Sequence, residues 1–383
     1  METYEAIVVG VGGMGSAAVY HLAQRGVRVL GLEQYDIPHD QGSSHGLSRI
    51  IRLAYFEHPS YVPLLHRAYE LWWALEREAQ ERLLTITGSL DIGPVESPVF
   101  SGALQAAQEH ALRHEVLDAA ALHRRFPGYS LPAPLLGLYQ PQGGLLDPER
   151  CIVAHVNGAL QHGATVHGRE AVQRWERQGT HLMVHTTRAT YRTQRVILTA
   201  GAWMSQLTAT AHGRFQAERQ VMIWMQPREP AWFRLDAFPV FNMAVEEGTF
   251  YGFPIYRNPG FKCARWHHLE QVVHDPGTMD RGCHSADEVI LRAFAQRYFP
   301  TGAGPTLSMR TCLFTNSPDT HFVIDVHPAD SAVCIAGGFS GHGFKFCSVV
   351  GEILADLAQE GHTRHDIALF RATRFDHVRG CVS

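Results

Sequence analysis

The sequence predicts an α/β protein of two domains, one built on a mostly parallel sheet and the other an α+β domain with a mostly antiparallel sheet. Its 383 residues exceed the roughly 250–300 residues at which a single hydrophobic core stops growing. Short apolar runs typical of buried parallel strands occur near both ends of the chain. The stretches between them, such as Val240–Val245 and Thr249–Phe253, are richer in aromatic residues and are predicted as antiparallel strands.

The first domain is expected to be discontinuous, because its predicted elements lie in separated parts of the chain. Asp147 followed by Pro148 is a typical helix start, with Asp as the N-cap and Pro at the first helical position. Leu182–Ala200 is predicted as a hairpin followed by a buried strand, Val333–Ala336 as a last parallel strand, and Ser348–Leu357 as a closing helix. We therefore assign 1–82, 147–216 and 319–383 to the first domain, and 83–146 and 217–318 to the second.

Composition narrows the class of protein. A hydrophobic content of 45%, a charged content of 18% and a net charge of -4 are typical of a globular protein and give no sign of a nucleic-acid interface. No apolar run is long enough to cross a bilayer and no signal peptide is visible, so we expect no membrane association and a cytoplasmic location. The seven cysteines form no Cys-x-x-Cys pair and the histidines are scattered, so no metal site is predicted.

The first 33 residues carry the clearest motif. Ala6–Val9 is predicted as a buried strand, Ser16–Gln24 as a helix and Val27–Leu32 as a second strand. The turn after the first strand has the pattern G-x-G-x-x-G, and Glu33 closes the second strand. A Rossmann-type dinucleotide-binding unit has this order of strand, glycine turn, helix, strand and acid.

Each part of this motif has a physical reason. Gly10 permits the tight turn, Gly12 lets the backbone approach a pyrophosphate, and Gly15 lets helix and strand pack closely. The helix N-terminus offers free N–H groups to phosphate oxygens. Glu33 can accept hydrogen bonds from ribose hydroxyls, which argues against a 2′-phosphate and hence against NADP. The motif alone does not separate FAD from NAD.

The polar segment from Pro38 to Arg52 favours a flavin. It holds Gly42-Ser43-Ser44-His45-Gly46 and ends in Arg49-Ile50-Ile51-Arg52, before a helix predicted from about Ser60 to Glu78. An NAD-binding unit normally continues into another helix, whereas a polar loop with two arginines suits a flavin edge and an anionic substrate. Taken alone, the two arginines are better explained as solvated surface charges.

Residues 42–52 resemble a segment of the monomeric sarcosine oxidase and N-methyltryptophan oxidase family, which consists of FAD-dependent amine oxidases of the D-amino-acid-oxidase-like superfamily. Further stretches agree with this resemblance, which runs from Ile7 to about Phe370: Thr199–Trp203, Phe250–Pro254 followed by Lys262, Arg310–Thr315, and Gly337–Phe346.

The resemblance implies a Rossmann-type FAD-binding domain, with FAD joined covalently through its 8α-methyl group to the sulfur of Cys312. The implied cofactor-binding residues are Gly10, Gly12, Gly13, Met14, Gly15, Glu33, Ser43, Arg49, Gly201, Trp203, Cys312, Gly341, Gly343, Phe344 and Lys345.

The resemblance also implies roles in the reaction. Arg52 and Lys345 match the pair that binds the substrate carboxylate, and Lys262 matches the lysine that activates dioxygen. The remaining implied site residues are Arg49 and His45, whose positive character would stabilise the reduced flavin, and Tyr251 beside the substrate.

The chain departs from the family pattern at three places. Phe314 stands where the family commonly has Tyr, which removes a hydroxyl from the substrate pocket. The histidine expected after Lys262 is ambiguous, and His267 is chosen over His268. The loop near Leu47-Ser48 also differs in polarity. These departures concern the substrate rather than the flavin.

The implied function is oxidation of a secondary amino acid or N-methyl amine, by hydride transfer to flavin N5 and reoxidation by oxygen to give an imine and hydrogen peroxide. A monomer is the implied state. The alternatives left open are a cyclic imino acid oxidase acting on pipecolate or proline-like compounds, an oxidase of larger substrates such as N-methyltryptophan, and a flavin dehydrogenase that uses a protein electron acceptor.

Overall fold

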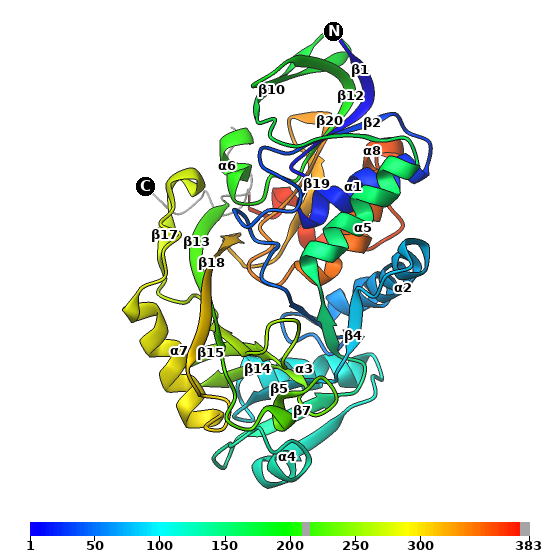
Figure 1. Cartoon of the computed structure of the whole chain (residues 1–383). Helices are drawn as coiled ribbons and strands as arrows, with labels where there is room; N and C mark the ends of the chain where they lie inside the picture. Colours follow the sequence, from blue (N-terminus) through cyan, green and yellow to red (C-terminus); the bar gives the residue numbers. More distant parts are fainter. Residues whose placement is uncertain (209–214, 376–383) are drawn as a thin grey trace, which may run out of the picture.

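The computed structural model describes residues 1–208 and 215–375, which form two lobes (Figure 1). One lobe is built on a mixed sheet with helices packed against it, and the other on a mostly antiparallel sheet. The α/β fold class predicted from the sequence is confirmed. The division into two discontinuous domains stays a prediction, and its ranges include 209–214 and 376–383, which lie outside the described residues.

The sheet of the first lobe has eight strands among the described residues: β1 (Thr3–Val9), β2 (Val29–Leu32), β9 (Thr165–His167), β10 (Val172–Gln178), β11 (His181–Thr186), β12 (Thr190–Leu198), β19 (Val323–His327) and β20 (Asp330–Gly337). Its parallel part runs in the order β9-β2-β1-β12-β20. The predicted hairpin and buried strand near 182–200 are one structure, because β12 pairs with β11 through its first half and with β20 through its second.

Both faces of the parallel part are buried, which explains why its strands are apolar at consecutive positions. Val8 faces a core formed with four helices: α1 (Gly13–Gln24), α2 (Val62–Ala79), α5 (Pro148–Gln161) and α8 (Cys347–Glu360). Figure 1 shows α1 beside α5 and α8. Ile7 and Val9 face the opposite core, which Leu182 of β11 also enters.

Local sequence explains where the helices start. Asp147 caps α5 by accepting a hydrogen bond from the backbone N–H of Arg150 at 3.0 Å, as the sequence predicts; such a cap contributes about 1 kcal/mol. The first helix begins at Gly13 rather than Ser16, because the end of the glycine turn is already helical. The helix predicted from Ser60 is preceded by the 3-10 turn η1 (Pro59–Tyr61).

The sheet of the second lobe has nine strands among the described residues: β5 (Ser89–Gly93), β6 (Glu115–Asp118), β7 (Leu136–Gln140), β13 (Gln216–Met225), β14 (Val240–Val245), β15 (Gly248–Phe253), β16 (Phe261–Arg265), β17 (Val272–Val273) and β18 (Thr306–Asn316). All the pairs are antiparallel except β5 with β14. The predicted antiparallel pairing of Val240–Val245 with the following strand is confirmed.

Helices cover this second sheet. The flanking helices are α3 (Pro98–Glu109), α4 (Ala119–Arg125) and α7 (Ser285–Tyr298). Phe250 of β15 stacks on Phe294 of α7 with the ring centroids 3.8 Å apart. The other short helical segments are η2 (Gly201–Trp203), α6 (Met204–Leu207), η3 (Pro230–Phe233), η4 (Pro276–Thr278), η5 (Phe344–Phe346) and η6 (Ala368–Phe370).

A small third sheet connects chain segments that lie far apart in sequence. The strand β8 (Gly144–Leu146) pairs with β3 (Arg49–Ile51) and with β4 (Leu84–Ile86), and both pairs are antiparallel. The pairing fixes the end of the 38–52 loop, because Arg49 lies within β3 and Arg52 follows its last residue directly. None of the described helices is apolar and long enough to span a bilayer.

Candidate active site

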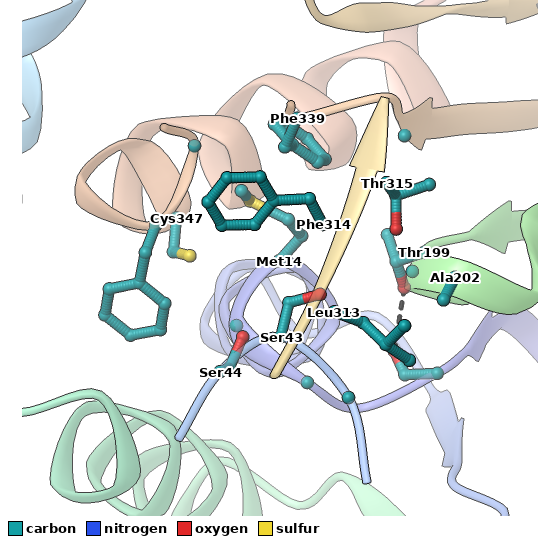
Figure 2. Close-up of a pocket in the computed structure, with 18 of the residues that line it drawn as sticks. Met14, Ser43, Ser44, Thr199, Ala202, Leu313, Phe314, Thr315, Phe339 and Cys347 are labelled. Carbon is teal, nitrogen blue, oxygen red and sulfur yellow. Dashed lines mark hydrogen bonds between the residues drawn. The ribbon is translucent and has the colours of Figure 1, made fainter. Parts of the chain in front are cut away.

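A cavity of about 500 Å³ is lined by residues of both lobes. In Figure 2, Met14 at the start of α1, Ser43 and Ser44 of the polar loop, and Phe314 of β18 surround this space. The predicted site residues that line it are Gly10, Gly12, Gly13, Met14, Glu33, Ser43, Arg49, Arg52, Gly201, Trp203, Tyr251, Cys312, Phe314, Gly341, Gly343, Phe344 and Lys345. The structure therefore gathers most of the predicted residues around one space.

The glycine turn has the geometry of a pyrophosphate cradle. Gly10 has a φ of +89°, which L side chains rarely adopt, and a Cβ at Gly15 would lie 1.8 Å from the carbonyl oxygen of Gly10. A Cβ at Gly12, in contrast, would meet nothing within 4 Å, so the space beside this residue is open. Gly12 caps α1 without a side-chain hydrogen bond, which leaves the first N–H groups of α1 free for an anion.

Glu33 is positioned for a ribose. It lies at the end of β2, is buried and lines the cavity. Its Oε2 accepts a hydrogen bond from Val11 N–H at 2.8 Å and its Oε1 accepts one from Tyr35 N–H at 3.1 Å. These bonds fix the carboxylate, which keeps further acceptor capacity for ribose hydroxyls. The turn and the acid together fit the adenosine and pyrophosphate parts of a dinucleotide.

Cys312 and Arg49 lie next to each other in the lining of the same cavity. Cys312 is buried on β18, and its Sγ lies 3.7 Å from an Arg49 guanidinium nitrogen. The same nitrogen of Arg49 donates to the carbonyl oxygen of Ser43 at 2.6 Å. Burial raises the pKa of the Cys312 thiol, while the charges of Arg49 and Lys262 oppose this effect.

Arg52 and Lys345 supply two buried cations to the same cavity. Arg52 is held by Glu57, whose two carboxylate oxygens lie 2.9 and 3.2 Å from one guanidinium nitrogen. The Lys345 ammonium donates to the carbonyl oxygen of His342 at 2.7 Å. Burial, reinforced by the charge of Arg52, lowers the pKa of Lys345 to about 7. An anion in the cavity would therefore meet one permanent cation and one that titrates near neutrality.

Aromatic side chains line the cavity near these cations. Tyr251 and Phe253 come from β15, and Phe314 comes from β18. Trp266 lies parallel to the His342 ring at 6.2 Å between centroids, and edge-on to Phe314 at 6.2 Å. The part of the cavity beside Phe314 is thus apolar and flat-walled, which suits a small organic substrate.

Four predicted site residues do not line this cavity. Gly15 is covered by the glycine turn itself. The Lys262 ammonium is buried and donates to the carbonyl oxygens of Gly46 and Ser48 at 2.7 and 3.1 Å. His267 is half-buried, and its Nδ1 lies 2.7 Å from Glu218 Oε2. Of the residues 266–268, Trp266 lines the cavity, whereas His267 and His268 do not.

His45 also differs from its expected character. It is 2% exposed and lines a second cavity, where it lies near Glu149 and Arg310. Burial and the charge of Arg49 lower the pKa of His45 to about 3. The low pKa indicates a neutral His45 ring near pH 7, and the expected role of His45 beside the flavin stays a prediction. Of the two residues assigned this role, Arg49 alone carries a positive charge there.

The cavity residues that sequence reasoning did not assign include Glu57, Asn242 and Trp266. Asn242 left a detectable signal, because it is the one polar residue in the otherwise apolar β14 segment Val240–Val245. Glu57 and Trp266 carried no comparable signal, since both lie outside the strands in polar or mixed stretches.

Comparison with known proteins agrees with this geometry. The chain matches the family described as FAD dependent oxidoreductase over residues 5–357. Monomeric sarcosine oxidase of Streptomyces avermitilis is 43% identical over 375 residues, which cover 97% of this chain and 98% of the relative. N-methyl-L-tryptophan oxidase of Citrobacter koseri is 33% identical and covers 97% of this chain and 99% of the relative.

Solved structures share the fold. NikD, an amino acid oxidase essential for nikkomycin biosynthesis, gives a TM-score of 0.85 at 26% identity and covers 97% of this chain and 98% of that chain. L-Proline dehydrogenase from P. horikoshii gives a TM-score of 0.86 at 21% identity, covers 98% of this chain and 99% of that chain, and shows the fold alone. Because the family match begins within β1 and ends within α8, it includes nearly every described element, and this chain belongs to the FAD dependent oxidoreductase family.

Proposed function

We propose that this flavoprotein is an oxidase of secondary amino acids or N-methyl amines, with sarcosine as the representative substrate. The observation that carries the proposal is that Arg52 and Lys345 line the same cavity as the glycine turn and Cys312. Two buried cations in a flavin cavity suit a substrate with a carboxylate, which Arg can bind through two parallel hydrogen bonds.

When bound, FAD takes a hydride equivalent from the carbon next to the amine nitrogen and passes the electrons to oxygen, which forms hydrogen peroxide. Arg52 and Lys345 bind and orient the carboxylate. Trp266 and Phe314 exclude water from the reacting carbon. The charge of Arg49 lowers the pKa of a bound amine and so favours the neutral form that reacts.

The covalent link belongs to the same proposal. We assign the attachment to Cys312 because its sulfur lines the cavity and faces a guanidinium that stabilises a thiolate. The resulting thioether would tether the flavin to β18. We also propose that the protein is a monomer and is located in the cytoplasm.

Oxygen is the proposed electron acceptor, and Lys262 is its proposed activating residue. A buried cation favours electron transfer to oxygen, because it stabilises the superoxide charge. Lys262→Met is therefore expected to slow flavin reoxidation by roughly 10²-fold or more while substrate reduction of the flavin changes little. Stopped-flow absorbance measures the two half-reactions separately. Normal reoxidation of the variant would exclude this role and favour a dehydrogenase with a protein acceptor.

The substrate is tested by a peroxide assay on the purified yellow protein with sarcosine, N-methyl-L-tryptophan, pipecolate and proline. Relatives of this chain are named for the first two compounds. We expect sarcosine to give the highest kcat/KM, because the sarcosine oxidase of Streptomyces avermitilis is 43% identical to this chain and the N-methyl-L-tryptophan oxidase of Citrobacter koseri is 33% identical. Peroxide from pipecolate or proline alone would support the cyclic imino acid alternative instead.

A further inference from the structure

Asp91 is a buried carboxylate directly behind the proposed substrate clamp. It lies on β5, is 0% exposed and does not itself line the cavity. Asn242 faces it across the parallel β5–β14 pair and donates from Nδ2 to Asp91 Oδ1 at 2.9 Å. The other carboxylate oxygen of Asp91 has no hydrogen-bond partner among the described residues. Burying a carboxylate with one oxygen that accepts no hydrogen bond destabilises the fold, which suggests that Asp91 has a function.

Arg52 is the cation that Asp91 faces. The Arg52 Nε lies 3.5 Å from Asp91 Oδ1, while another guanidinium nitrogen binds Glu57. The remaining nitrogen donates to the carbonyl oxygen of Ala54 at 2.8 Å. Arg52 is thus flanked by two carboxylates before any substrate arrives, and only part of its charge acts on the cavity.

Two buried basic groups lie beside two buried acids. Arg52 and Lys345 are opposed by Glu57 and Asp91, and all four side chains are at most 10% exposed. Burial raises the pKa of Asp91 to about 6, although Arg52 and the Asn242 hydrogen bond counteract it, so the acid is ionised above neutral pH. A bound carboxylate therefore adds negative charge beside an Arg52 whose own charge Asp91 already offsets in part.

We propose that Asp91 is a positioning residue, which is held in place by Asn242 and weakens the attraction of Arg52 for carboxylates. The affinity of the site for a carboxylate is then set by Asp91 as well as by Arg52. This inference rests on the proposed function, because it assumes that Arg52 binds the substrate carboxylate.

The test compares a charged ligand with its neutral counterpart. Propionate and propionamide have similar shapes and neither has an amine, and their binding to the flavin-loaded protein can be followed by the change in flavin absorbance at pH 8. Asp91→Asn keeps the side-chain shape and an oxygen that can accept from Asn242, but it removes the charge. We expect the variant to bind propionate about tenfold more tightly and propionamide with unchanged affinity.

Asn242→Leu is the matched control. It removes the amide that holds Asp91 and leaves the carboxylate, so any gain in the ratio of propionate to propionamide affinity should be smaller than in Asp91→Asn. Charge-independent damage to the site would weaken both ligands in either variant. The proposal is overturned if Asp91→Asn binds propionate no better than the wild type, or if Asn242→Leu gives the same selective gain. The titration measures binding without turnover. A negative result for Asp91 can therefore be distinguished from a failure of the protein to oxidise amines.

Discussion

Cys312 is a thiol on which burial and charge act in opposite directions. Burial disfavours the thiolate, while Arg49, with a guanidinium nitrogen 3.7 Å from the sulfur, favours it. The thiolate is the nucleophile that an electrophilic flavin methyl group requires. At Cys312, the cysteine proposed to bind the flavin, Arg49 therefore offsets part of the cost of burying a thiolate, whereas among the described residues Cys151 has no neighbouring cation that does so.

Replacing Cys312 with Ser should abolish covalent attachment without removing the nucleotide cradle. After acid precipitation, the wild-type pellet should stay yellow, because a thioether survives denaturation, whereas the flavin of the variant should pass into the supernatant. Absorbance of both fractions measures the outcome. Flavin in the wild-type supernatant would exclude a covalent link.

Single residues also mark the limits of prediction from sequence. Gly10, Gly12 and Glu33 could be predicted because their roles depend on a few neighbouring residues. Trp266 could not be predicted, because neighbouring residues after the end of β16 face different ways. Trp266 lines the cavity, while the next residue, His267, is partly exposed. The neutral state of His45 depends on how completely the folded chain buries it, which no local pattern records.

Individual helices and strands could be predicted where a few adjacent residues determine them. The pairing of strands that are distant in the sequence could not. The α5 cap and the β14–β15 hairpin follow from a few adjacent residues. The β5–β14 pair joins segments about 150 residues apart, and it alone brings Asp91 to Asn242. The small sheet of β3, β4 and β8 could not be predicted either, since none of its strands has a distinctive sequence pattern.

The start of α7 illustrates how an element can be held by one buried acid. Asp287 binds the Arg219 guanidinium through both oxygens at 2.9 Å and accepts from the backbone N–H of His284 at 2.8 Å. Burial alone would raise the pKa of Asp287, but these partners outweigh burial and lower it to about 2. The carboxylate therefore contributes stability above the pKa of an unfolded Asp, and this contribution is lost as the pH falls towards 2.

Asp287→Asn should lower the free energy of unfolding by about 3 kcal/mol at pH 7, because Arg219 is left buried without a counter-charge. The difference from wild type should shrink by roughly 1 kcal/mol between pH 7 and pH 3. Urea unfolding at several pH values measures it. The control is Asp236→Asn in the exposed pair with Arg234, which should leave the midpoint unchanged. A pH-independent difference would contradict the assignment.

At the scale of the whole molecule, the cavity depends on both lobes. The lobe with the parallel sheet supplies the glycine turn and the Gly341–Lys345 stretch, while the other supplies Cys312, Tyr251 and Trp266. The first lobe would hold the dinucleotide through its glycine turn, and the second lobe would supply the wall beside the flavin. The parallel sheet and its glycine turn could be predicted from the sequence. The wall could not, because it forms only when strands that are distant in the chain pair with one another.

The central claim is that this cavity oxidises a small carboxylated amine with bound FAD. Mixing the yellow protein with sarcosine in the absence of oxygen tests it most directly. We predict that the flavin absorbance bleaches, and that admitting oxygen restores the colour with formation of hydrogen peroxide. A flavin that stays oxidised with sarcosine and with every other N-methyl amino acid tried would contradict the claim.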